Sequence, residues 1–235
     1  MKSLADALVE SGGKWDRVSA DHYPTPPDVT QALVDWLKQI GRWDDFGSIY
    51  EPACGEGQMA RVLEQNGAVV DASDLNATGY GFQADFLSGE QNLYARASWA
   101  DAVITNPPFS HAEQFIRRAL EWSLCDRPFV AMVLKSAYWH AARRAKLFRE
   151  HPPSWVLALT WRPAFLQETR GKSPLMEVVW VVWDPKLVDG VTFYDVLDRP
   201  KGMSDFLPPT LEVLLARAEA SVVALNGVMC GGDVG

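Results

Sequence analysis

The stretch SIYEPACGEGQMARVLEQNG, residues 48–67, decides the fold. Its first four residues have the pattern of a short strand, and residues 58–66 have the spacing of a helix that ends at Gly67. Gly55 and Gly57 in the turn between them permit a tight bend and a close backbone approach to a ligand. Strand, glycine turn and helix in this order predict a unit of a parallel α/β sheet, with a ligand site at the carboxyl end of the strand.

The same alternation of strands and helices continues on both sides of this stretch. Helical spacing is seen over residues 27–40, 112–123, 138–149 and 211–225. Strand patterns are seen at 48–51, 68–74, 81–86, 101–105, 129–134, 155–161 and 176–183. The last two strands have no helix between them, so we expect an antiparallel pair at the sheet edge. The predicted fold is Rossmann-like and doubly wound α/β, with a mostly parallel seven-stranded sheet and an antiparallel edge strand.

The length of 235 residues and mass of 26.1 kDa fit one α/β domain, which we expect over residues 21–225. Residues 1–20 and 226–235 are expected to be flexible ends. The longest apolar runs, 129–134 and 178–183, are far shorter than the ~18 residues needed to cross a bilayer. The first ten residues lack the apolar stretch of a secretory signal. We therefore expect a cytoplasmic protein with no membrane segment.

The net charge and the cysteine pattern argue against several classes of protein. The net charge of −8 argues against a protein that coats phosphate backbones over its whole surface, so any nucleic-acid contact must be local. Three cysteines, Cys54, Cys125 and Cys230, have no CxxC spacing, and the four histidines include no HExxH pair. We expect neither a disulfide framework nor a metal site.

The glycine turn also matches a dinucleotide fingerprint, because residues 55–60 satisfy GxGxxA and Asp74 ends the next strand. An NAD-dependent oxidoreductase is therefore one alternative. A pyrophosphate group, however, prefers the positive end of a helix, and Glu51 and Glu56 beside the turn oppose it. A ligand with a cationic centre and no phosphate fits these acids better.

The run Glu-Pro-Ala-Cys-Gly-Glu-Gly at 51–57 resembles the first motif of class I S-adenosylmethionine-dependent methyltransferases. Tyr-Pro-Thr-Pro at 23–26 resembles a motif that precedes it in many DNA adenine methyltransferases. The resemblance implies that Asp74 binds the ribose hydroxyls and that Asp85 binds the adenine amino group of S-adenosylmethionine. A turn-forming Asp74 and a helix-capping Asp85 are the alternatives. The implied cofactor-binding set is Tyr23, Thr25, Glu51, Pro52, Ala53, Gly55, Gly57, Asp74, Leu75, Asp85, Phe86 and Asn106.

A second motif, Asn106-Pro107-Pro108-Phe109, follows the strand at 101–105. The two prolines fix the backbone and remove two donors, so the Asn106 side chain and the Pro107 carbonyl can both accept hydrogen bonds at one spot. An amino group bound there would be oriented for in-line attack on a methyl group, without a covalent enzyme nucleophile. Phe109 offers a face to stack on a planar substrate. The alternative is a loop in which Asn106 only caps the next helix.

Asn-Pro-Pro-Phe resembles the catalytic motif of amino methyltransferases, with Asn106, Pro107, Pro108 and Phe109 as its residues. Members of that class act on adenine N6 in DNA, on guanine N2 in ribosomal RNA or on a release-factor glutamine. The Tyr-Pro-Thr-Pro motif favours the DNA adenine enzymes of restriction-modification type, in particular the small phage and prophage ones. Cytosine C5 methylation is disfavoured, because it needs a Pro-Cys nucleophile and no cysteine here follows a proline.

The resemblance implies double-stranded DNA as the partner, with the target adenine flipped out of the stack. Phe109 and Phe165 are the candidates for stacking on it, although Phe165 equally fits a core position. The candidates for DNA phosphate contacts are Arg143, Arg144, Lys146, Arg170 and Lys172. A solvated helix face is the alternative for the first three. These short segments predict a short or degenerate recognition sequence, unless a homodimer adds contacts. A catalytically silent nucleic-acid-binding subunit is a further alternative.

Overall fold

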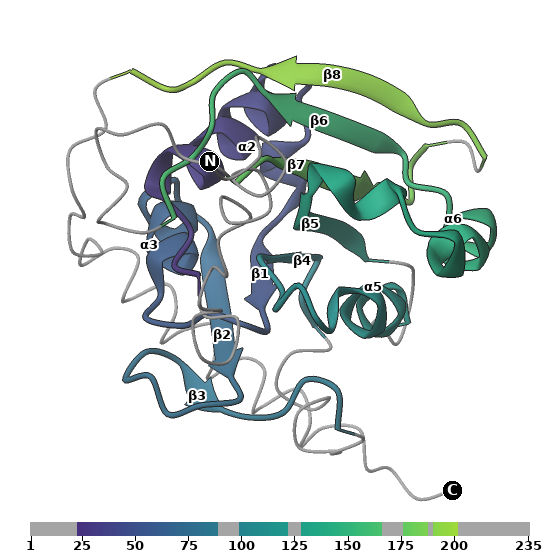
Figure 1. Cartoon of the computed structure of the whole chain (residues 1–235). Coiled ribbons are helices and arrows are strands. Elements are labelled where there is room, and N and C mark those ends of the chain that lie inside the picture. The colour runs from purple at the N-terminus through teal and green to yellow at the C-terminus, as the bar shows by residue number, and fades with distance from the viewer. Residues whose placement is uncertain (1–22, 89–98, 122–127, 166–175, 188–189, 202–235) are drawn as a thin grey trace, which may run out of the picture.

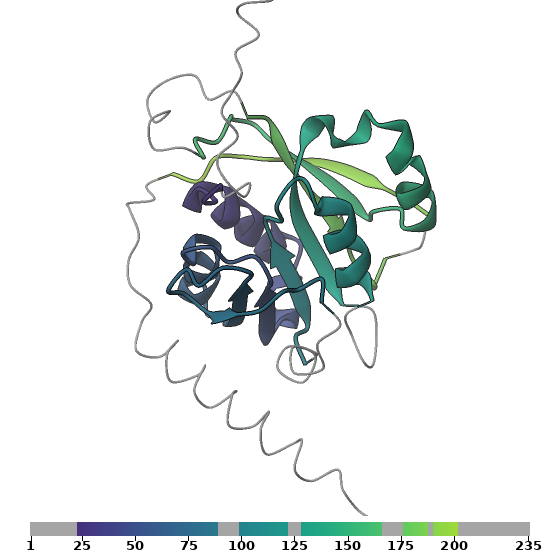
Figure 2. The same cartoon turned by 60° about the horizontal axis from the view of Figure 1, so that its bottom comes forward.

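A mixed β-sheet lies between two layers of helices in the computed structural model, which describes residues 23–88, 99–121, 128–165, 176–187 and 190–201 (Figures 1 and 2). The strands are β1 Ser48–Glu51, β2 Val69–Asp74, β3 Phe82–Gln83, β4 Ala102–Thr105, β5 Phe129–Lys135, β6 Trp155–Leu159, β7 Val178–Trp183 and β8 Phe193–Leu197. The α-helices are α2 Pro27–Gln39, α3 Gln58–Gln65, α5 Ala112–Leu120 and α6 Ala145–Glu150. Three short 3₁₀ helices are η2 Trp43–Asp45, η3 Ser136–Trp139 and η4 Ala142–Arg144.

The eight strands lie in the order β3-β2-β1-β4-β5-β7-β6-β8. Strands β3, β2, β1, β4 and β5 are parallel to one another, while β7 is antiparallel to both β5 and β6. The outermost strand, β8, pairs parallel with β6. The predicted Rossmann-like fold with a mostly parallel sheet and an antiparallel pair, β6 and β7, is therefore confirmed.

Strand β8 is an addition to the seven expected strands, and it makes β6 an inner strand. Its sequence lacks a clear burial signal, because Leu197 is its only buried residue. Pairing with β6 and a 3.0 Å hydrogen bond from Trp36 Nε1 to Asp195 Oδ2 hold the strand in place. These contacts come from residues far apart in the sequence, so local periodicity could not reveal them.

The helix expected over residues 138–149 is instead divided into η3, η4 and α6. Tyr138 and Leu147 are both buried in the same apolar cluster. They are nine residues apart, so one continuous helix at about 100° per residue would place them on opposite faces. The break in the helix allows both side chains to reach the core.

The two faces of the sheet carry separate apolar clusters. Along β5, Ala131 and Val133 pack with α2 and α3, whereas Val130, Met132 and Leu134 pack with α5 and α6. This alternation is the period of two expected for a central strand. The described helices include none long and apolar enough to cross a membrane.

Candidate active site

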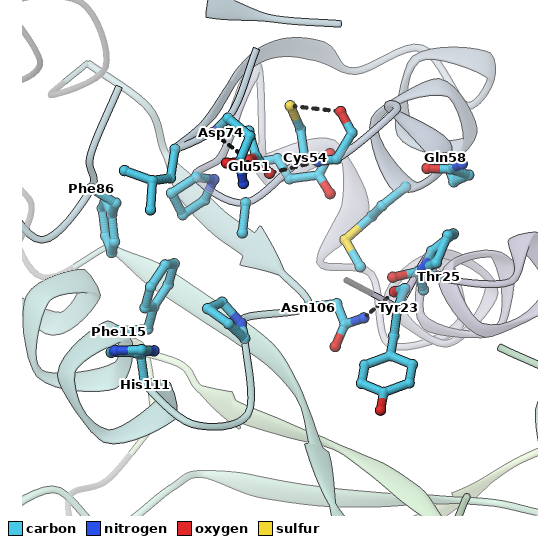
Figure 3. Close-up of a pocket in the computed structure, with 18 of the residues that line it drawn as sticks. Tyr23, Thr25, Glu51, Cys54, Gln58, Asp74, Phe86, Asn106, His111 and Phe115 are labelled. Carbon is cyan, nitrogen blue, oxygen red and sulfur yellow. Dashed lines mark hydrogen bonds between the residues drawn. The ribbon is translucent and has the colours of Figure 1, made fainter. Parts of the chain in front are cut away.

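A cavity of about 500 Å³ lies where β1, β2, β3 and β4 end (Figure 3). This is the carboxyl edge of the parallel strands, where open α/β sheets bind ligands. Figure 3 shows Phe86, Phe115 and His111 on one side of the cavity and Tyr23 and Thr25 on the other. The lining residues are Tyr23, Pro24, Thr25, Glu51, Pro52, Ala53, Cys54, Gly55, Gln58, Met59, Asp74, Leu75, Asn76, Asp85, Phe86, Leu87, Asn106, Pro108, Ser110, His111 and Phe115.

The glycine turn after β1 is fixed to the end of β2. The Gly55 N–H donates to Asp74 Oδ2 at 3.0 Å. Gly57 has a φ of +83°, and a Cβ there would lie 2.3 Å from the Tyr80 ring. Gly57 is therefore required by the turn and by Tyr80, and it does not line the cavity, whereas Gly55 does.

The residues at the end of β2 and after β3 line the cavity. Asp74 Oδ1 accepts from the Asn76 N–H at 2.8 Å, so both of its oxygens already have one backbone donor. The Asn76 Nδ2 also donates to Oδ1, at 3.3 Å. A carboxylate offers about four acceptor sites, so one site is left for a hydroxyl donor. Leu75 is 62% exposed beside it and offers an apolar surface. Asp85 Oδ1 accepts from the Leu87 N–H at 2.9 Å in a turn, so this residue has a local turn contact as well as a place in the lining.

Glu51 places an acid at the bottom of the cavity. It is 2% exposed, and its Oε2 forms no hydrogen bond among the described residues. Burial, with the Asp74 and Glu64 charges adding to it, raises the pKa of Glu51 from 4.5 to about 8. A cation bound nearby would favour the ionised form of this carboxyl group.

Cys54 also lines the cavity, but it has no features of a nucleophile. Burial, with the charges of Glu51 and Asp74 adding to it, raises the pKa of the Cys54 thiol above its usual range. Its Sγ lies 3.4 Å from the Tyr80 carbonyl oxygen. A protonated, buried thiol is unreactive, so Cys54 has a packing role.

The Asn106 side chain has a fixed orientation. Its Nδ2 donates to the Tyr23 carbonyl oxygen at 3.1 Å, which joins the loop after β4 to the segment before α2 (Figure 3). Its Oδ1 is buried and has no hydrogen-bond partner among the described residues. Because the amide nitrogen is already used, the free oxygen is an acceptor for an N–H or O–H group that enters the cavity.

A second cavity, of about 510 Å³, lies on the other side of the same loop. Phe109 lines this cavity and not the first, while Ser110 lines both. The Phe109 ring lies 5.9 Å from the Tyr23 ring and 4.7 Å from Lys135 Nζ. We call this second space the basic cavity, because Lys135, Arg143 and Arg144 line it.

Several predicted site residues lie outside both cavities. Phe165 is 6% exposed and belongs to the apolar core, so stacking on a base would require it to leave the core. Lys146 lies 3.6 Å from Glu150 and lines neither cavity. Pro107 is buried and lines neither cavity, although its neighbours in the motif do. Arg170 and Lys172 lie outside the described residues, as do the predicted helix at 211–225 and both predicted flexible ends.

Sequence reasoning missed several lining residues. His111, whose Nδ1 lies 2.9 Å from Ser110 Oγ, and Phe115 follow the end of the Asn-Pro-Pro-Phe motif by two and six residues. Their closeness to the motif in the sequence could have indicated that they line the cavity. Lys135 follows the apolar run of β5 directly, and a charge at the end of a buried strand also indicates the carboxyl edge of the sheet. Tyr138 gave no such signal, since its place depends on the break in the predicted helix.

Comparison with known proteins gives structural matches only. No family model matches the chain, and no curated protein sequence matches it. A proposed class I S-adenosylmethionine-dependent methyltransferase from Listeria monocytogenes has a TM-score of 0.56 at 13% identity, over 81% of this chain and 71% of that one. The fold is that of class I S-adenosylmethionine-dependent methyltransferases.

Two further structures support this assignment of the fold. A proposed RNA methyltransferase from Pyrococcus horikoshii has a TM-score of 0.52 at 19% identity, over 76% of this chain and 95% of that one. A modification subunit of a proposed type I restriction enzyme from Vibrio vulnificus has a TM-score of 0.53 at 14% identity. This match covers 98% of the chain studied here and 57% of the Vibrio chain. At these identities the likeness extends to the fold.

Proposed function

We propose that the chain is an S-adenosylmethionine-dependent methyltransferase that methylates adenine N6 in DNA. The observation that carries this proposal is the orientation of Asn106. Its Nδ2 donates to the Tyr23 carbonyl oxygen, and its buried Oδ1 has no hydrogen-bond partner in the described part of the chain. This arrangement suits an exocyclic amino group, which must donate a hydrogen bond while its nitrogen attacks.

The first cavity fits S-adenosylmethionine by its chemistry. Glu51 provides a buried carboxyl oxygen that has no hydrogen-bond partner among the described residues, and Asp74 and Asp85 add two more acids. Three acids in one cavity favour a ligand with cationic centres and oppose a pyrophosphate, which weighs against a dinucleotide. Asp74 would hold a ribose hydroxyl, and Leu75 and Phe86 would contact the adenine ring. When bound, the cofactor would supply an electrophilic methyl group on a sulfonium.

The loop after β4 would position the acceptor. Asn106 Oδ1 would accept one hydrogen of the substrate amino group, which orients the nitrogen lone pair toward the methyl group. The methyl-to-nitrogen bond forms as the methyl-to-sulfur bond breaks, and the extra amino proton leaves to solvent. Phe109 would stack on the planar ring that carries the amino group. No enzyme nucleophile is involved, in agreement with the protonated state of Cys54.

Adenine in DNA is favoured over the other amino acceptors by the sequence motifs. Tyr23 comes from the Tyr-Pro-Thr-Pro segment, and its carbonyl oxygen holds the Asn106 amide. The two motifs that resemble those of DNA adenine methyltransferases therefore meet at one hydrogen bond. The occurrence of this fold in a modification subunit of a proposed type I restriction enzyme is consistent with such a substrate.

The test is to identify the methylated product. The protein would be incubated with methyl-labelled S-adenosylmethionine and duplex DNA, ribosomal RNA or a release factor, followed by mass spectrometry of nucleosides and peptides. We expect N6-methyladenine from DNA, and its loss in Asn106→Ala. N2-methylguanine or methylglutamine would transfer the assignment to the other acceptors. Cofactor and DNA binding without turnover would identify a silent nucleic-acid-binding subunit instead.

A further inference from the structure

The basic cavity beside the Asn106–Phe109 loop has a charge opposite to that of the first cavity. Lys135, Arg143 and Arg144 line it, and Glu113 is the one acid among the described residues that does so. Glu113 is already paired with Arg117 at 3.3 Å, and Arg117 does not line the cavity. The three cations therefore exceed the available acid, in a chain whose net charge is −8.

The structure presents these cations to the cavity in two ways. Arg144 is half-buried, with its guanidinium 3.8 Å from the Tyr138 ring centroid and its Nη1 donating to the Tyr138 carbonyl oxygen at 2.7 Å. These contacts with Tyr138, which also lines the cavity, fix the position of the guanidinium. Lys135 and Arg143 are exposed, and neither forms an ion pair within the described part of the chain. A fixed guanidinium beside two exposed cations that have no acidic partner among the described residues is suited to an anion.

We propose that the basic cavity binds a backbone phosphate of the nucleic acid strand that carries the acceptor base. The inference rests on the proposed function, because Phe109 borders the basic cavity while Asn106, three residues earlier, borders the first. A base stacked on Phe109 with its amino group at Asn106 would place its sugar-phosphate backbone toward Lys135. A glutamine side chain or a neutral small molecule would gain nothing from three cations, so the site selects a polyanion.

The first measurement is the salt dependence of binding to a short fluorescent DNA duplex. Lys135→Gln and Arg143→Gln should each weaken binding and make the slope of log affinity against log salt shallower by about 0.9, the value for one lost phosphate contact. Lys186→Gln is the matched control, since it removes the same charge. Lys186 lies 3.2 Å from Asp45 and follows β7, which is antiparallel to β5, so it lies at the end of the sheet away from both cavities. The salt slope of this variant should equal that of the wild type.

The second measurement locates the phosphate. In a series of duplexes, one linkage at a time around the target adenine is replaced by an uncharged methylphosphonate. Lys135→Gln should weaken binding to most duplexes of the series. At one linkage this loss of affinity should disappear, because the phosphate charge that Lys135 binds is already absent. Three results would each overturn the inference. They are a loss of affinity that is equal at every linkage, a salt slope equal to that of Lys186→Gln, and absence of oligonucleotide binding.

The two proposals fail in different ways. Binding that depends on Lys135 without any adenine methylation would reject the proposed function and retain the phosphate site. Adenine methylation with a KM that Lys135→Gln and Arg143→Gln leave unchanged would reject the phosphate site and retain the function. The affinity of each variant for S-adenosylhomocysteine, measured by calorimetry, serves as the control for correct folding of the first cavity.

Discussion

Replacing Glu51 by Gln should stabilise the ligand-free protein at alkaline pH. Burial raises the pKa of this carboxyl to about 8 in the folded chain, against 4.5 as its ordinary value. Between these pH values unfolding releases a proton, so the contribution of Glu51 to stability falls as pH rises and is constant above about pH 8. At about 1.36 kcal/mol per pH unit, the loss is at most about 5 kcal/mol. Gln has no proton to release and avoids this loss.

Urea unfolding of the ligand-free protein between pH 5 and pH 9 measures this effect. The difference in unfolding free energy between Glu51→Gln and wild type should grow with pH up to about 8 and then level off. Glu56→Gln is the control, because Glu56 lies on the same turn but is exposed to water. Its unfolding free energy should have the same pH dependence as that of the wild type. Parallel pH profiles of Glu51→Gln and wild type would refute the reasoning. The same variant should weaken S-adenosylmethionine binding at pH 8, because Gln cannot become an anion beside a cation.

Three other substitutions test the site. Asn106→Ala should lower turnover by about 10²-fold, or about 2.7 kcal/mol, with S-adenosylhomocysteine affinity nearly unchanged, and a wild-type rate would make the loop structural. Asp74→Ala should strongly weaken S-adenosylhomocysteine binding in calorimetry, since each charge-assisted hydrogen bond contributes about 1.5 to 3 kcal/mol; unchanged affinity in a folded variant would remove Asp74 from the site. Phe109→Ala should lose more activity on paired adenine than on mismatched adenine, where flipping costs less, and equal losses on matched oligonucleotides would exclude a flipping role.

The sheet and the first cavity could be predicted because local patterns specify them. The turn after β1, the acid at the end of β2 and the acid after β3 are each encoded within a few residues of a strand. Strand β8 and the burial of Phe165 depend instead on contacts between distant segments. The basic cavity also depends on contacts between separate segments. Lys135 on β5 meets Arg143 and Phe109 there because η3 and η4 replace the first part of the predicted helix.

The orientation of Asn106 shows the limit of a motif most clearly. The Asn-Pro-Pro-Phe run supplies an amide with both a donor and an acceptor, and nothing within the run decides which of them faces the cavity. The Tyr23 carbonyl oxygen, 83 residues earlier in the chain, binds the donor and thereby leaves the acceptor free. The same segment brings the Tyr23 ring to within 5.9 Å of Phe109. The ability of the loop to accept a substrate amino group therefore depends on the packing of residues 23–26 against it, so a change that displaces this segment should impair the chemistry without altering the motif.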